Sequence, residues 1–173
     1  MTTARMRKAR SLVTVILTTG LTTPVTDTAL AVVRVVLAWI FTYYGAGKLF
    51  GWFNGPGIHR TAIYFSTTAH LHPGGFFAVL GGVIEFGGAL ALLLGVGSRV
   101  AGLALVGDQV MAMITVTWKN GINSLSSTPG YEFNLTLVAL ALVIVAFGAG
   151  RFSVDAVASR RLRELDDRNS DGL

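Results

Sequence analysis

The chain has 173 residues, of which 52% are hydrophobic and only 13% are charged, against about 25% charged residues in a typical soluble domain. It contains no cysteine, which excludes disulfides, thiolate metal sites and a thiol relay within this chain. A redox role would therefore need a bound cofactor or a partner protein. Most of the 14 Lys and Arg residues flank apolar segments, and no base-reading motif accompanies them, so nucleic acid is not an expected partner.

Residues 1–27 form a basic arm that we expect to lie in the cytoplasm or on the inner face of a membrane. The basic start and the apolar stretch 12–21 leave a second interpretation open, a signal peptide cleaved near Ala29-Leu30-Ala31. Pro24 and Asp27 favour instead the entry of a helix, with Asp27 as its N-cap.

Four apolar runs follow, and each is close to the roughly 17–25 residues that span a bilayer. They cover residues 28–50, 75–94, 100–118 and 133–148. The longest connection, 51–74, has apolar residues between Ile58 and Phe65 at the spacing of a short interfacial helix. The predicted fold is all-α: an integral membrane bundle of four transmembrane helices over 28–156, with a short interfacial helix in the first outer loop. Residues 157–173 are predicted to be a polar cytoplasmic tail, a helical turn or two followed by disorder.

The basic residues also predict the orientation. With both termini inside, ten Lys and Arg residues lie on the inner side and three, Lys48, Arg60 and Lys119, on the outer side. This bias favours cytoplasmic termini.

Three ionisable residues lie inside apolar runs: Arg34 in the first, Glu85 in the second and Asp108 in the third. A bare charge near mid-bilayer costs at least ~2.5–3.5 kcal/mol, so such groups normally face the bundle interior and pair. All three lie about 9–14 Å from the inner ends of their runs, and we therefore predict a buried Arg34–Glu85–Asp108 cluster. One Arg against two carboxylates leaves one negative charge, so one carboxyl is expected to hold a proton. The cluster is then either a structural ion pair or a route for protons.

A second polar set lies on the predicted outer side. His70 and His72 lack a third ligand at a clear spacing, so no metal is expected. Lys48 and Lys119 are interpreted as snorkelling to the interface. Tyr44 is a candidate cofactor contact, with a helix or lipid contact as the alternative.

Three segments resemble motifs of the DoxX family, and together they cover about residues 31–155. They are Arg34-Val-Val-Leu-Ala-Trp-Ile-Phe-Thr-Tyr-Tyr-Gly-Ala-Gly-Lys48-Leu49, Glu85-Phe-Gly-Gly-Ala-Leu-Ala-Leu-Leu-Leu-Gly-Val-Gly-Ser-Arg99 and Gly148-Ala-Gly-Arg-Phe-Ser-Val-Asp155. The resemblance implies a four-helix protein of the bacterial cell membrane that is associated with redox systems. One relative is a subunit of a thiosulfate:quinone oxidoreductase, and others are linked to oxidative and thiol stress. Arg34, Lys48, Glu85 and Arg99 match the patterned polar positions.

Three functions follow from these observations. The first is a redox-linked subunit that helps pass electrons to menaquinone or ubiquinone. In it, Glu85, Asp108 and Arg34 are the catalytic candidates, and Arg34, Glu85, Tyr44 and Lys48 are the cofactor contacts. The second is a non-catalytic anchor or assembly subunit for a partner enzyme, with membrane lipid and a homo-oligomer as further candidate partners. The third is a small-solute or proton transporter, which the absence of an inverted repeat disfavours.

Overall fold

The computed structural model describes residues 23–123 and 128–170, and every regular element within these ranges is helical. The main helices are α2 (Pro24–Phe50), α3 (Gly57–Thr67), α4 (Gly74–Leu94), α5 (Ser98–Ala112), α6 (Glu132–Phe147) and α7 (Val154–Ser170). Short turns η1 (Trp52–Asn54), η2 (Met113–Thr117) and η3 (Trp118–Asn120) lie between α2 and α3 and beyond α5. The all-α prediction is confirmed, and all four apolar runs and the segment around residues 58–65 form helices.

Local sequence explains where the long helices begin and end. Thr23 caps α2 by accepting a hydrogen bond from the backbone of Thr26, and Pro24 occupies the first turn. The prediction of Asp27 as the N-cap is therefore wrong, because the helix begins one turn earlier. Gly51 and Gly95 end α2 and α4 with φ angles of 71° and 69°, which glycine adopts without steric cost.

Three helical segments are long and apolar enough to cross a membrane: Pro24–Phe50, Gly74–Leu94 and Ser98–Asn120. Helix α6 is also apolar but shorter, with 16 residues. Large apolar side chains remain exposed along these helices, including Trp39 at 79% and Ile114 at 64%. Such a surface suits acyl chains and is rare on a soluble monomer.

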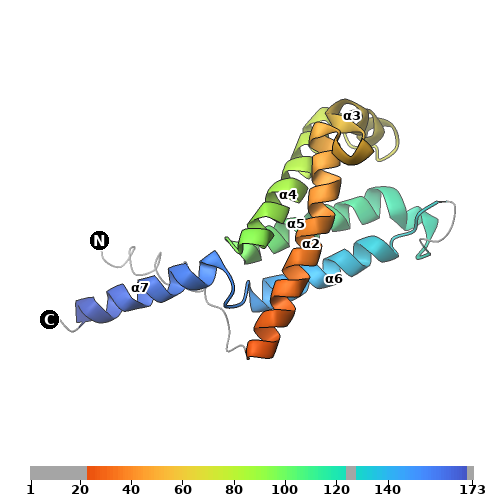
Figure 1. Ribbon diagram of the computed structural model, residues 1–173. Coiled ribbons are helices and arrows are strands. Elements are labelled where there is room, and N and C mark those ends of the chain that lie inside the picture. The colour runs from red at the N-terminus through yellow and green to blue at the C-terminus, as the bar shows by residue number, and fades with distance from the viewer. Residues whose placement is uncertain (1–22, 124–127, 171–173) are drawn as a thin grey trace, which may run out of the picture.

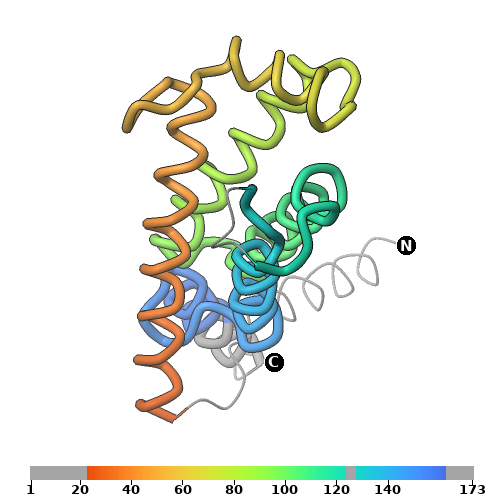
Figure 2. Tube along the Cα trace, turned by 90° about the vertical axis from the view of Figure 1, so that its right-hand side faces the viewer, coloured from red at the N-terminus to blue at the C-terminus, as the bar shows by residue number. Residues whose placement is uncertain are grey.

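The long helices form two antiparallel pairs. Helix α2 packs along α4, and α5 packs along α6 (Figure 1). Gly45 permits the first contact, because a Cβ atom there would lie 2.5 Å from the backbone nitrogen of Phe86. The pairs meet near the α4–α5 connection and diverge toward α3 on one side and the end of α5 on the other (Figures 1 and 2). Leu37, Phe41 and Leu105 lie in the core they share.

Arg34 joins the ends of several helices. Its guanidinium donates to the carbonyl oxygens of Leu92 at 2.7 Å, Leu93 at 3.0 Å, and Ala149 and Phe152 at 2.8 Å each. The first two carbonyls belong to the last turn of α4. Carbonyls in the last turn of a helix receive no hydrogen bonds from a following helical turn. Arg34 is only 4% exposed, and its guanidinium is engaged by these four carbonyls.

Two carboxylates complete this junction. Asp155 accepts hydrogen bonds from the backbone nitrogens of Gly97 at 2.8 Å and Ser98 at 3.1 Å, and so caps the start of α5 from α7. Asp27 accepts from the backbone nitrogen of Arg151 at 2.9 Å. We call Arg34, Asp27 and Asp155 with these partners the junction clamp.

The chain after residue 154 differs from the prediction. Helix α7 runs from Val154 to Ser170, beyond the one or two turns expected, so the predicted disorder is wrong up to that residue. Asp155 sits in its first turn, a position that favours an acidic residue. The predicted basic arm lies outside the described residues, except for its last few positions.

The junction clamp leads to a first prediction. We expect Arg34→Gln to destabilise the protein, because one amide cannot replace a guanidinium that serves four buried carbonyls. Hydrogen bonds to a charged group contribute about 1.5–3 kcal/mol each, so a loss of about 3 kcal/mol is a conservative expectation. This corresponds to a fall in Tm of roughly 6–12 °C for a chain of this size, measured by thermal unfolding in detergent. Arg160→Gln, at an exposed position of α7, is the control, and equal Tm values for the two variants would contradict the clamp.

Candidate functional site

A buried ion pair joins the first and second long helices. The ammonium of Lys48, in the last turn of α2, lies 2.6 Å from Oε1 of Glu85, in the middle of α4. Helical side chains point back toward the N-terminus, so Lys48 reaches the level where Gly45 brings the two backbones together. Glu85 is 2% exposed. The interpretation of Lys48 as snorkelling is therefore wrong: its charge is directed into the bundle.

Asp108 of α5 faces the same pair, and its carboxyl interacts with both Glu85 and Lys48. The predicted approach of Glu85 and Asp108 is thus confirmed. Gly81 of α4 lies beside this carboxyl, and a Cβ atom at this position would be in van der Waals contact with Oδ1 of Asp108 at 3.4 Å. The site combines one ammonium and two carboxyls, and one proton shared between the carboxyls would make the trio neutral.

Arg34 does not belong to this trio. Its guanidinium is engaged by the carbonyls of the junction clamp, and Lys48 takes the predicted place of Arg34 as the partner of Glu85. The physical reason lies in the start of α2. The depth argument counted from residue 28, whereas the helix begins at Pro24, so Arg34 lies level with the end of α4.

Amide side chains extend the trio to α6. Gln109 donates from Nε2 to Oδ2 of Asp108 at 3.0 Å and accepts from Nδ2 of Asn134 at 2.9 Å. The Asn134 oxygen in turn accepts from the hydroxyl of Thr117 at 3.1 Å. The polar network therefore includes residues of α2, α4, α5 and α6. The sequence analysis missed Gln109 and Asn134, although amides within apolar runs are the groups that hydrogen-bond between membrane helices.

One atom of the network has no partner among the described residues. Oε2 of Glu85 is buried and accepts no hydrogen bond. An unsatisfied buried carboxylate oxygen is costly, and its neighbour Asp108 can serve it only by carrying a proton. A ligand or a water molecule with a hydrogen-bond donor would satisfy it in the same way.

Three cavities adjoin the network, and Lys48 lines all of them. The α4–α5 cavity, of about 380 Å³, is lined by Asp108 and by mostly apolar residues; these include Tyr64, Phe65, Leu71, Phe77, Leu80, Ile84 and Met111. The α5–α6 cavity, also about 380 Å³, is lined by Glu85 and the amides Gln109 and Asn134. The α2–α3 cavity, of about 600 Å³, lies under the 51–57 loop.

The remaining predicted residues have defined places. Tyr44 lines the α2–α3 and α5–α6 cavities, so it lies within reach of any ligand held there. His70 and His72 are both exposed. Within residues 23–123 and 128–170, no group of three or more His, Cys, Asp or Glu side chains comes together at a possible metal site.

The helices, their lipid-suited surface and the polar network in their midst define the class: a multi-pass helical membrane protein with a charged interior site. The family model of DoxX matches residues 29–118, which is more than half of the chain. The protein therefore belongs to the DoxX family, as its motifs predicted. Comparisons with curated proteins and with solved structures found no significant match.

The buried ion pair leads to a second prediction. Lys48→Met leaves two carboxyls without a counter-charge, so we expect a strong loss of stability, of about 3 kcal/mol. Glu85→Gln in the same chain removes one of those charges and is expected to restore part of the loss. A double-mutant cycle on thermal unfolding should therefore give a coupling of about 1 kcal/mol or more. Additive effects would show that the two groups do not interact. Lys119→Met, at an exposed lysine near the same end, controls for the loss of a charge.

Proposed function

We propose that this protein is a quinone-binding subunit of a redox system in the bacterial cell membrane. The observation that carries the proposal is the α4–α5 cavity, whose lining combines apolar and aromatic residues with Asp108 and Lys48. Quinone headgroups need an apolar slot for the ring and hydrogen-bonding groups for the two carbonyl oxygens. Binding pockets of this class are mostly apolar with a few convergent polar groups, as here.

We propose with it a topology of four spans with both termini in the cytoplasm. Helix α6 is the fourth span: its 16 residues extend about 24 Å, close to the ~30 Å hydrocarbon core, and local thinning accommodates the difference. Its buried Leu137, Ala141 and Ile144 pack into the bundle core. Helix α3 then lies at the outer interface, next to exposed aromatic residues such as Trp52 and Tyr64.

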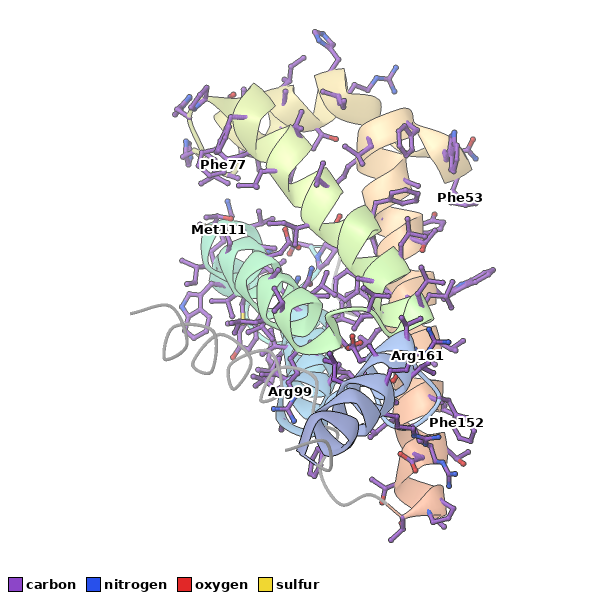
Figure 3. The ribbon with its side chains drawn as sticks, turned by 90° about the vertical axis from the view of Figure 1, so that its left-hand side faces the viewer. Phe53, Phe77, Arg99, Met111, Phe152 and Arg161 are labelled. Atoms are coloured by element: carbon purple, nitrogen blue, oxygen red, sulfur yellow. The ribbon has the colours of Figure 1, made fainter. Side chains whose placement is uncertain are left out.

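The walls of the cavity suit entry from lipid. Phe77 on α4 and Met111 on α5 lie on facing sides of the opening between the two helix pairs (Figure 3). Gly107 lines the same cavity, and a side chain added there would meet no atom within 4 Å. The isoprenoid tail of a quinone can pass between these residues into the lipid while the quinone ring lies next to Asp108.

The carboxyls supply the proton chemistry of the proposal. Reduction of a quinone to a quinol consumes two electrons and two protons. The electrons come from a partner redox protein, because this chain has no cysteine and no redox group of its own is proposed. Glu85 lines the α5–α6 cavity and Asp108 lines the α4–α5 cavity. A proton can therefore enter at Glu85, pass to Asp108 and reach the quinone oxygen, while Lys48 offsets the negative charge left behind.

A second candidate, the anchor or assembly subunit, is favoured by α7. This helix extends away from the two helix pairs (Figure 1), and its exposed Arg160 and Arg161 suit an acidic partner surface. The two functions are compatible, because a partner docked on α7 would also be the source of electrons.

Filling the cavity provides the third prediction. Gly107→Leu is expected to reduce the affinity for a menaquinone analogue at least tenfold by occupying the space of the ring. Protein reconstituted in nanodiscs is titrated with the analogue, and binding is followed by quenching of tryptophan fluorescence. Gly87→Leu is the matched control, because a side chain there also meets no atom within 4 Å and Gly87 lines none of the three cavities. Wild-type protein that binds no quinone would rule out the proposal, and equal effects of the two variants would rule out this cavity.

The proton route provides the fourth prediction. Electrochemical reduction of the bound analogue is expected to change the protonation of a carboxyl group, which infrared difference spectra detect in the carboxylic acid region. Glu85→Gln or Asp108→Asn should remove or shift this band while quinone binding persists, since both changes preserve side-chain shape. Spectra identical to wild type in both variants would show that neither carboxyl moves a proton.

A further inference from the structure

The α2–α3 cavity has a chemistry that the proposed quinone site does not use. At about 600 Å³ it is the largest of the three cavities described here. It lies between the end of α2, the 51–57 loop and α3, at the end of the molecule that carries α3 (Figure 1). Lys48, Tyr64 and Phe65 separate it from the α4–α5 cavity, because these three residues line both.

The charge around this cavity is positive. Lys48 and Arg60 line it, and none of its lining residues is Asp or Glu. The ammonium of Lys48 is neutralised by Glu85, whereas Arg60 has no ion-pair partner among the described residues. Helix α3 begins at Gly57 beside the lining residues Gly55 and Pro56, with no side-chain cap and no acidic residue in its first turn. Its amide groups add partial positive charge to that of Arg60.

Aromatic rings form much of the wall. Tyr43 and Phe53 stack with centroids 5.3 Å apart, and Tyr44, Trp52, Tyr64 and Phe65 also line the cavity. Phe53 holds a φ of 56°, which is unfavourable for a residue with a side chain and places its ring on Tyr43. Gly55 lets the loop pack closely on the end of α2. Its Cα lies against the backbone of Gly47, and a Cβ atom at Gly55 would not fit there.

We propose that this cavity binds the headgroup of an anionic phospholipid. Arg60 and the first turn of α3 would hold the phosphate, and the aromatic wall would cover the glycerol and the start of the acyl chains. An aromatic wall alone would also suit a choline headgroup, but the guanidinium and the helix N-terminus repel a cation. A free phosphate ion satisfies the positive groups and leaves the apolar wall uncovered. The volume is in the range of small-molecule sites, roughly 300–1,000 Å³.

The test is lipid binding to the full chain in detergent, followed by native mass spectrometry with phosphatidylglycerol or phosphatidylcholine. The first phosphatidylglycerol is expected to bind more tightly than phosphatidylcholine, and Arg60→Gln should weaken it about tenfold, the usual scale for losing a hydrogen bond to a charged group. Arg60→Lys, which keeps the charge, should retain most of the affinity. Lys119→Gln removes a charge outside the cavity and should leave the first binding constant unchanged.

Three results would overturn the proposal. Equal effects of Arg60→Gln and Lys119→Gln would show unspecific attraction to a basic surface. Preference for phosphatidylcholine would show that the aromatic wall selects a cation. Displacement of the lipid by inorganic phosphate at millimolar concentration would show a free oxyanion site instead of a lipid site. Gly107 does not line this cavity. The test of the quinone site with Gly107→Leu and the test of the lipid site with Arg60→Gln therefore have independent outcomes.

Discussion

The arrangement of the bundle depends on the cost of a charge in a medium of low dielectric. Glu85 lies almost fully buried on α4, and only a cation within reach offsets the loss of its hydration. Lys48 supplies it from the end of α2, and this requires the two backbones to approach at Gly45. The same constraint aligns α5, since Asp108 adds a second carboxyl that a single ammonium cannot neutralise. The ion pair therefore links α2 to α4, and the carboxyl of Asp108 on α5 adds a negative charge that a proton shared with Glu85 would neutralise.

The polar groups of the interior fall into two sets with different roles. The junction clamp satisfies backbone groups: Arg34 serves carbonyls of α4 and of the turn before α7, and Asp155 serves amides of α5. Its groups have many fixed partners and leave little capacity for a ligand. The trio of Lys48, Glu85 and Asp108 is the reverse, with an unpartnered oxygen and cavities on several sides. We therefore assign the proposed proton chemistry to the trio and a structural role to the junction clamp.

Much of the fold and part of the site could be predicted from the sequence, because the length of an apolar run and a charge within it can be read directly along the chain. The helices, the approach of Glu85 to Asp108 and the family followed from them. The place of Arg34 did not, since depth counted along each run assumes that all helices begin at one level, and α2 begins earlier. Lys48 was misplaced for a related reason: a lysine at a helix end looks the same whether its chain points to water or into the bundle. Asn134 and the cavities depend on how the two pairs diverge, which periodicity does not encode.

The divergence of the two pairs links stability to the proposed function. Membrane helices gain little from hydrophobic burial against each other, so contacts between small residues and polar groups decide where they meet. Here such contacts gather at the α2–α4 crossing and at the junction clamp, and the far ends stay apart. If Leu and Phe side chains closed the bundle along its whole length, the same trio would be buried and no ligand could reach it. Because the helices are held together at one end only, Glu85 is buried and Asp108 is half-buried, yet both line cavities that the proposed ligand would use.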